Sequence, residues 1–160
     1  AGQVQFGPAA VPRGDLMASG LYNRGALILT DGTAQWDTAD IQVLLTTSSY
    51  TPVKTHNVVT DVTNECSTGG GSNYVRKATT GNIITEVDGS NRVEYDLDNL
   101  TYTALGVSAG TPKYAVLYLE GASDALRELV AFVDLGTADT PDGSNWLLSW
   151  AATGAFHLDT

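Results

Sequence analysis

The sequence predicts a mainly β protein: an antiparallel β-sandwich or barrel-like domain with one or two short helices and an extended N-terminal arm. Short runs of β-branched, aromatic and aliphatic residues recur along the chain, separated by Gly, Asp, Asn and Pro. Charged residues make up only 16% of the 160 residues, against roughly a quarter in an average soluble domain. This length suits one domain with its own core. We therefore expect an arm over residues 1–18 and a single β-rich domain over 19–160.

The N-terminal arm is interrupted too often by Gly and Pro to form a regular element. Its apolar content exceeds what a purely solvating tail needs. Two interpretations remain open, a disordered tail and an arm that becomes ordered against a partner. In the second interpretation, the expected partner contacts are Val4, Phe6, Val11, Leu16 and Met17.

The first regular elements are expected soon after the arm. Ser19 is placed to cap a short helix over 21–29, and the Asp31-Gly32 turn ends it. The run IQVLLTT, residues 41–47, predicts a strand with its alternate aliphatic side chains on one face. Residues 54–66 fit either helical turns or a strand, and the pattern leaves both open.

From residue 74 onward the pattern is almost entirely β, after a glycine-rich loop at 68–73. Asp88-Gly89 is a strong hairpin signal. The segments 113–120 and 129–135 are apolar on both faces, which is typical of central strands. The full set of strands expected in this half is 74–78, 82–87, 92–97, 101–105, 113–120, 129–135, 145–150 and 155–158.

The segment VEYDLDNLTY raises the question of a carboxylate site. Glu94, Asp96 and Asp98 stand at every second position, so a strand would project all three from one face within about 14 Å. Such a ladder could hold a cation or act in acid–base chemistry. Clean alternation with apolar residues favours the third reading, the solvated side of a half-buried strand. The residues expected to face the core are Val93, Tyr95 and Leu97.

Other residues that could carry chemistry do not form a familiar constellation. The loop over 134–145 contains Asp134, Asp139, Asp142 and Asn145. Oxygen-rich loops can hold Ca²⁺, but this spacing is not that of an EF-hand, and we favour a turn. His56 and His157 have no zinc-site spacing, and His157 is expected on the outer face of a terminal strand. The sequence contains neither a G-x-S-x-G elbow nor a P-loop.

The lone cysteine and the tryptophans have structural and functional interpretations. Cys66 could be a reactive thiol, but a single cysteine in this setting favours an inert one. Trp36, Trp146 and Trp150 could stack on sugars, and Trp146 and Trp150 share one face of a predicted strand. Aromatic side chains more often fill cores and interfaces. We therefore expect no enzyme activity, no cofactor, no metal and no small-molecule ligand.

The charge balance argues against two classes of partner. Acidic side chains number 18 and basic ones 8, a net charge of −10. Binding of nucleic acid or of an anionic membrane needs clustered Lys and Arg, which the sequence lacks. The longest apolar runs are far below the roughly 20 residues that cross a bilayer. The segment AGQVQFGPAAVPRGD lacks the pattern of a signal peptide, so synthesis in a cytosol is expected.

Several blocks together resemble a family of small tailed-bacteriophage virion structural proteins, of the capsid decoration or cement type. The blocks are LYNRGALILTDGTAQWDTADIQVLLTTSSYTP, NRVEYDLDNLTYTAL, KYAVLYLEG, LVAFVDLG and NWLLSWAATGAFHL, within residues 21–158. Their motifs are structural and not catalytic. The arm over 1–18 has no counterpart in the resemblance, and the region 65–82 is shorter than the family pattern.

The resemblance implies a virion component made in the cytoplasm of a host bacterium and placed on the capsid surface. Its partners would be the major capsid protein and further copies of itself in a homo-oligomer, with no nucleic acid and no membrane. A tail, neck, baseplate or fibre-associated virion protein is one alternative role. A carbohydrate-binding β module, using the tryptophans as a platform, is another.

Overall fold

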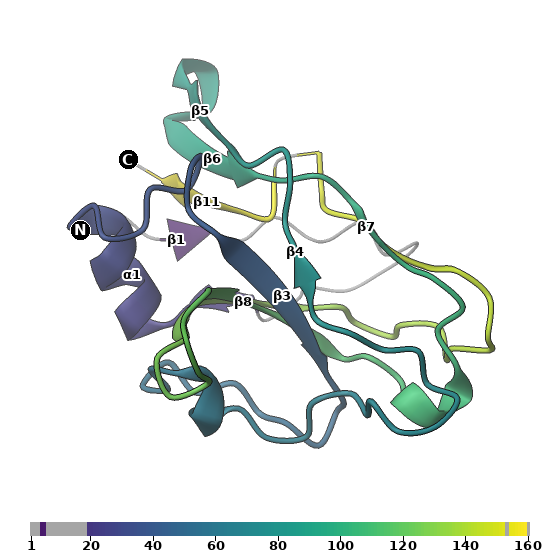
Figure 1. Cartoon of the computed structure of the whole chain (residues 1–160). Coiled ribbons are helices and arrows are strands. Elements are labelled where there is room, and N and C mark those ends of the chain that lie inside the picture. Colours follow the sequence, from purple (N-terminus) through teal and green to yellow (C-terminus); the bar gives the residue numbers. More distant parts are fainter. Residues whose placement is uncertain (1–3, 6–18, 153, 160) are drawn as a thin grey trace.

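The structure is a computed structural model that describes residues 4–5, 19–152 and 154–159 (Figure 1). The structure is 33% strand and 12% helix, which confirms the mainly β, antiparallel prediction. The described residues form a five-stranded sheet of order β2-β9-β8-β3-β4, a four-stranded sheet of order β1-β11-β6-β5 and a β10-β7 pair.

The strands of these sheets come from distant parts of the chain. The five-stranded sheet contains β2 (Gly20–Leu21), β3 (Ile41–Thr46), β4 (Lys77–Ala78), β8 (Tyr114–Leu119) and β9 (Glu128–Asp134). The four-stranded sheet contains β1 (Val4–Gln5), β5 (Ile83–Val87), β6 (Arg92–Asp96) and β11 (Phe156–Asp159). The remaining elements are β7 (Leu100–Tyr102), β10 (Trp146–Leu148), α1 (Asn23–Thr30) and three 3-10 turns, η1 (Val59–Asp61), η2 (Asp88–Ser90) and η3 (Val107–Ala109).

The main core lies between the five-stranded sheet and the other two sheets. Ile41, Val43 and Leu45 face it from β3, as their alternation predicts. From the opposite side, Tyr95 and Phe156 stack at 4.6 Å between ring centroids. This arrangement is that of a sandwich, in which alternate residues of each strand fill the space between the sheets.

The outer face of the five-stranded sheet is also buried. A second apolar cluster lies there. Tyr22, Tyr50 and Val59, from three separate segments, cover the side chains that the sheet contributes. These are Leu44, Val116, Tyr118, Leu129 and Phe132. The prediction that 113–120 and 129–135 are two-faced central strands is therefore confirmed. The pairing of β8 with β9 contains a bulge. Leu117 lies opposite Ala131 and the next residue, Tyr118, lies opposite Leu129, so Val130 is the extra residue on β9.

The predicted helix is present, but its cap is not the predicted one. Tyr22 occupies the N-cap position of α1, whereas the Ser19 hydroxyl accepts a hydrogen bond from the Asp134 N–H at 3.2 Å. Ser19 lies too early because Gly20–Leu21 pairs with β9 before the helix begins. A Cβ at Gly25 would lie 1.9 Å from the Val130 carbonyl oxygen. This glycine therefore lets α1 approach β9 closely.

Several boundaries differ from the sequence pattern. β4 covers only the last two residues of the predicted strand 74–78, since the Tyr74 N–H turns to the Ser72 hydroxyl. β7 ends at Tyr102, before Ala104, which has a φ of 49°. The open segment 54–66 contains η1, capped by the Asp61 carboxylate, which accepts the N–H groups of Asn57 and Val58.

The β5–β6 hairpin forms where Asp88-Gly89 predicts it, and it projects at the top of the molecule in Figure 1. Its connection is η2 followed by Asn91, which adopts a φ of 49°. β5 is an edge strand, exposed at every position from Ile83 to Glu86. This exposure distinguishes it from the strands of the five-stranded sheet.

Candidate functional site

The predicted contact residues of the arm are mostly beyond what the structure describes. Phe6, Val11, Leu16 and Met17 lie outside the described residues. Val4 belongs to β1, where it stands opposite Leu158 of β11. The backbone at Val4 therefore extends the four-stranded sheet, and the prediction of a partner contact there stays a prediction.

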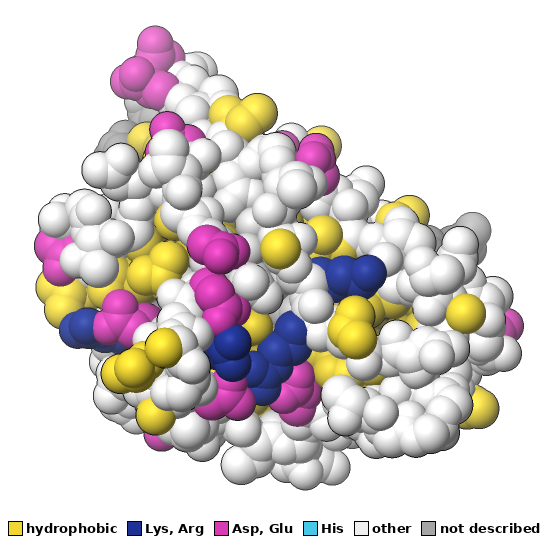
Figure 2. Space-filling view, in the orientation of Figure 1, with side chains coloured by type: hydrophobic (Ala, Val, Ile, Leu, Met, Phe, Trp, Pro, Cys, Tyr) yellow, Lys and Arg dark blue, Asp and Glu magenta, His cyan; other side chains and the backbone are white. Residues whose placement is uncertain are grey.

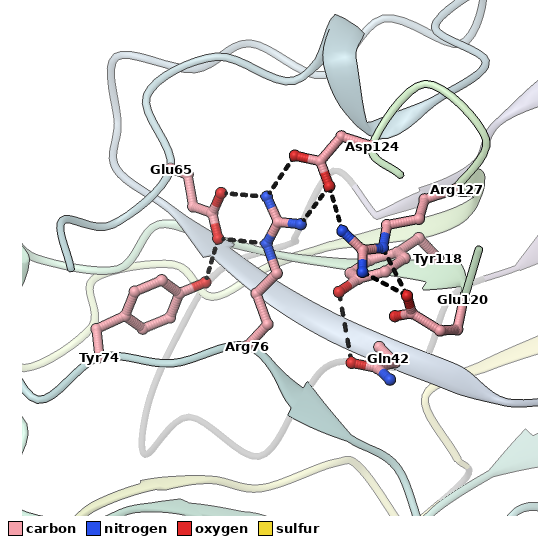
Figure 3. Close-up of polar contacts among 8 residues, drawn as sticks. All are labelled: Gln42, Glu65, Tyr74, Arg76, Tyr118, Glu120, Asp124 and Arg127. Carbon is pink, nitrogen blue, oxygen red and sulfur yellow. Dashed lines mark hydrogen bonds and ion pairs between the residues drawn. The ribbon is translucent and has the colours of Figure 1, made fainter. Parts of the chain in front are cut away.

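The most concentrated group of polar side chains is an ion-pair network on the five-stranded sheet (Figure 3). It joins two arginines and three carboxylates: Arg76, Arg127, Glu65, Glu120 and Asp124. We call these five residues the arginine network. They come from the segment before β4, from the segment after η1 and from the connection between β8 and β9.

Arg76 is the centre of the arginine network. Its Nε and Nη2 donate to the two carboxylate oxygens of Glu65 at 2.8 and 2.7 Å. Its Nη1 and Nη2 donate to the two oxygens of Asp124 at 2.6 and 3.0 Å. Both contacts are bidentate, the geometry in which a guanidinium binds a carboxylate most strongly.

Arg127 completes the arginine network at the start of β9. Its Nη1 donates to Asp124 Oδ1 at 2.5 Å, and its Nε donates to Glu120 Oε1 at 2.7 Å. Asp124 thus bridges the two arginines. The connection from Glu120 to Arg127 is consequently closed upon itself, and Asp124 ties it to the segment just before β4.

An aromatic side chain supports both guanidinium groups. The guanidinium carbons of Arg76 and Arg127 lie 5.7 and 5.9 Å from the Tyr118 ring centroid, within cation–π range. Tyr74 adds a further link, because its hydroxyl donates to Glu65 Oε1 at 2.9 Å and accepts the Leu45 N–H at 2.9 Å. Figure 3 shows these residues converging from separate segments.

The close contacts of the arginine network shift its pKa values. The hydrogen bond from Arg76, joined by that from Arg127, lowers the pKa of Asp124 to about 2. Hydrogen bonds to Glu65 and then to Asp124 raise the pKa of Arg76. Three carboxylates face two guanidiniums, so the group carries a net charge of −1. Most of the N–H donors of the two arginines are directed at these three carboxylates.

The arginine network is a set of structural contacts between separate segments of the chain. It contains no nucleophile paired with a base, which acyl or phosphoryl transfer would need. It instead fixes three segments that are far apart in the sequence, since Arg76 lies 48 residues from Asp124. The network has no signature in the sequence, because the basic residues are scattered along the chain. The nearest local signal was the pair of acids at 120 and 124 shortly before Arg127.

The carboxylate ladder is only partly as predicted. Asp96 and Asp98 are exposed, while Tyr95 and Leu97 are buried and Val93 is partly buried. The prediction was wrong for Glu94, whose side chain is only 15% exposed and pairs with Arg92. Two causes account for this: Glu94 lies opposite His157 on β11, and the neighbouring Arg92 Nε reaches its Oε1 at 2.8 Å.

The acidic loop before β10 uses its oxygens internally. Asp134 pairs with Lys113 at 2.7 Å and accepts the Gly136 N–H. Asp142 accepts the Ser144 N–H, and Asn145 accepts the Ala104 N–H, as turn-forming side chains do. In the parts of the chain that the structure describes, no three His, Cys, Asp or Glu side chains are grouped as metal ligands.

The histidines and the cysteine are tied to the fold. His157 was expected on an outer face, but it is buried, with 8% of its surface exposed, on β11, which lies between β1 and β6. His56 Nδ1 lies 3.0 Å from the Tyr50 hydroxyl, which in turn bonds Tyr22. Cys66 is also buried, and this burial raises the pKa of its thiol to about 12. A thiolate is the reactive form of cysteine, so this shift favours an inert residue.

The tryptophans do not form an exposed platform. Trp36 and Trp150 are buried, and their indole N–H groups donate to the Asp96 and Asp98 carbonyl oxygens at 2.9 and 3.0 Å. Trp146 is partly buried against the main core. Two of the three indoles thus bind the backbone at and just after β6. The exposed tryptophan face that a carbohydrate-binding module would use for stacking is not formed by these side chains.

Comparisons with known proteins give no relative: no protein-family model, curated protein or solved structure matches the chain. Among the helices within the described residues, none is long and apolar enough to cross a membrane.

Proposed function

We propose that this protein is a structural component of a tailed-bacteriophage virion, a capsid decoration or cement protein. It binds the outside of the head as a small homo-oligomer and stabilises contacts between subunits of the major capsid protein. Many modest contacts, repeated by the symmetry of the shell, add up to a large stabilisation. The task is binding and not catalysis.

The observation that carries this proposal is the resemblance of five sequence blocks to that family. These blocks supply the folded body: α1 and β3 lie in the first, β6 and β7 in the second, and β8 to β11 in the last three. The chemistry of the site is compatible with a binding role. The Arg76 and Arg127 guanidiniums pair with carboxylates of the fold, and the Cys66 thiol is buried. The three indole N–H groups donate to backbone carbonyl oxygens.

Copy number in purified virions tests the proposal. A decoration protein is present in hundreds of copies per particle, and a tail, neck or baseplate part in only a few. Quantitative gel electrophoresis of virions, calibrated on the major capsid protein, separates these roles. Absence of the chain from purified particles would refute both.

The arm has its own test. A variant lacking residues 1–18 should remain folded by circular dichroism but lose binding to heads that have been stripped of the protein. The full-length chain serves as the matched control in the same binding assay. Full occupancy by the truncated chain would show that the arm is not the contact.

A further inference from the structure

The edge of β5 is the largest strand edge that the described residues leave open. β5 pairs with β6 alone, and four of its five residues are exposed. The other sheet ends among the described residues are shorter: β1, β2 and β4 have two residues each, and β7 and β10 have three. An open edge presents unpaired N–H and C=O groups that can pair with an added strand.

The side chains of β5 do not block such an addition. Natural proteins protect edges with Lys or Pro, and β5 contains neither. It instead presents Ile83 and Ile84, which are 56% and 45% exposed and lie on opposite faces of the strand. β-branched residues favour the extended backbone that an added strand requires.

The exposed acidic side chains of the β5–β6 hairpin favour a positively charged partner. Glu86 and Asp88 are exposed and have no ion-pair partner in the described ranges, while Arg92 is held by Glu94. Figure 2 shows acidic side chains at the outer end of this hairpin. With a net charge of −10, a second copy of the chain would bring like charge to this edge. A basic segment would bring the opposite charge.

We propose that the open edge of β5 is a docking site for an extended, basic segment of a partner protein. The segment adds antiparallel to β5, with Lys or Arg opposite Glu86 and Asp88 and apolar residues opposite Ile83 and Ile84. Main-chain hydrogen bonds hold it, and the alternate side chains give the preference for basic sequence. The inference rests on the proposed function only for the partner's identity, which would be a shell protein.

A peptide tests the docking without any particle. The probe is a fluorophore-labelled peptide, Lys-Val-Lys-Thr-Ile-Val-Thr, and its twin carries Glu in place of each Lys. Fluorescence anisotropy with the full chain at low salt should give saturable binding with a Kd below about 1 mM. The Glu twin should bind at least about tenfold more weakly, since it meets like charge.

Matched variants locate the site. Glu86→Lys should weaken binding of the Lys peptide about fivefold or more, since an attraction becomes a repulsion. Asp139→Lys makes the same change of net charge at an exposed position in another loop and should leave Kd within about twofold. Amide chemical shifts should move most at Ile83–Val87 on peptide addition.

Three results would overturn the inference. The first is no saturable binding of the Lys peptide, and the second is equal weakening by Glu86→Lys and Asp139→Lys. The third is a dimer in sedimentation equilibrium that Ile84→Lys dissociates and the exposed control Leu126→Lys does not, because a second copy would then occupy the edge. None of these results bears on copy number in virions, so the proposed function is tested separately.

Discussion

The β8–β9 pair and the β5–β6 pair are both antiparallel and rich in β-branched and aromatic residues, but they differ in burial. The first lies at the centre of the five-stranded sheet, with apolar clusters on both faces and the arginine network closing its connection. The second projects from the body, and within the described part of the chain it has a neighbouring strand only on the β6 side.

In these two pairs of strands, the place of a strand in the fold accounts for the burial of its side chains better than residue type does. Val116 and Ile84 are both β-branched aliphatic residues in strands, and they are 0% and 45% exposed. The central strand is covered because segments distant in sequence return over it. No described segment covers the β5–β6 hairpin in this way, and four of the five residues of β5 are exposed.

The largest expected difference in stability is between two glycine substitutions, one on α1 against β9 and one in the β5–β6 connection. Gly25→Ala places a Cβ 1.9 Å from the Val130 carbonyl oxygen, so α1 must move away from β9. We expect a loss of about 3 kcal/mol in the free energy of unfolding. The control is Gly89→Ala in the hairpin connection, where a Cβ meets nothing within 4 Å.

Urea unfolding followed by tryptophan fluorescence measures both variants. Gly89→Ala should change the free energy of unfolding by less than about 0.5 kcal/mol. If Gly25→Ala were equally neutral, the close approach of α1 to β9 would be wrong.

The second test removes one arginine from each region. Arg76→Met breaks two bidentate contacts and leaves Glu65 and Asp124 without that partner. The side chains of Arg76 and Glu65 are 22% and 26% exposed, so we expect a loss between the values for exposed and buried pairs, about 2 kcal/mol. Arg92→Met removes the single pair to Glu94 in the hairpin and should cost under about 1 kcal/mol.

Thermal and urea unfolding at neutral pH, in low and high salt, compare the two arginine variants. Equal losses would mean that the arginine network contributes no more than an ordinary surface pair.

Local patterns were enough to predict most of the strands. The runs that became β3, β8 and β9 show period-two apolar alternation or two-faced apolar character, and the Asp88-Gly89 signal located the hairpin. Strand ends were less accurate where a side chain captures the backbone. At Tyr74, for example, the N–H bonds the Ser72 hydroxyl instead of a neighbouring strand.

The candidate site could not be predicted in the same way, because it depends on contacts between distant segments. Arg76 and Asp124 meet only after β4 and the β8–β9 connection are placed on one sheet. The position of His157 likewise depends on distant segments, because β11 pairs with β1 and β6. The periodicity of a strand shows which of its residues lie on the same face. It does not show which other segments pack against that face.

The third prediction concerns acid. Because Arg76 lowers the pKa of Asp124 to about 2, from about 3.9 in an unfolded chain, the ionised carboxylate stabilises the folded state. That stability is present above about pH 4 and is lost as the pH falls towards 2. The wild type should therefore lose more stability over this range than Asp124→Asn, which has no such group to protonate. Denaturant unfolding at several pH values measures the difference, and parallel curves would contradict it.

The smallest expected effects lie in the hairpin, where the acidic alternation began as a candidate reaction site. Asp96→Asn should change the free energy of unfolding by less than about 0.5 kcal/mol, because Asp96 is exposed and an amide oxygen can still accept the Leu97 N–H. Glu94→Gln should cost more, up to about 1 kcal/mol, since it removes the ion pair with Arg92. Urea unfolding of each variant ranks the two carboxylates. If Asp96→Asn alone lowered the free energy of unfolding by more than about 1 kcal/mol, this carboxylate would have to be paired or bind an ion. The interpretation of this strand face as solvated would then fail at Asp96, the position where it is strongest.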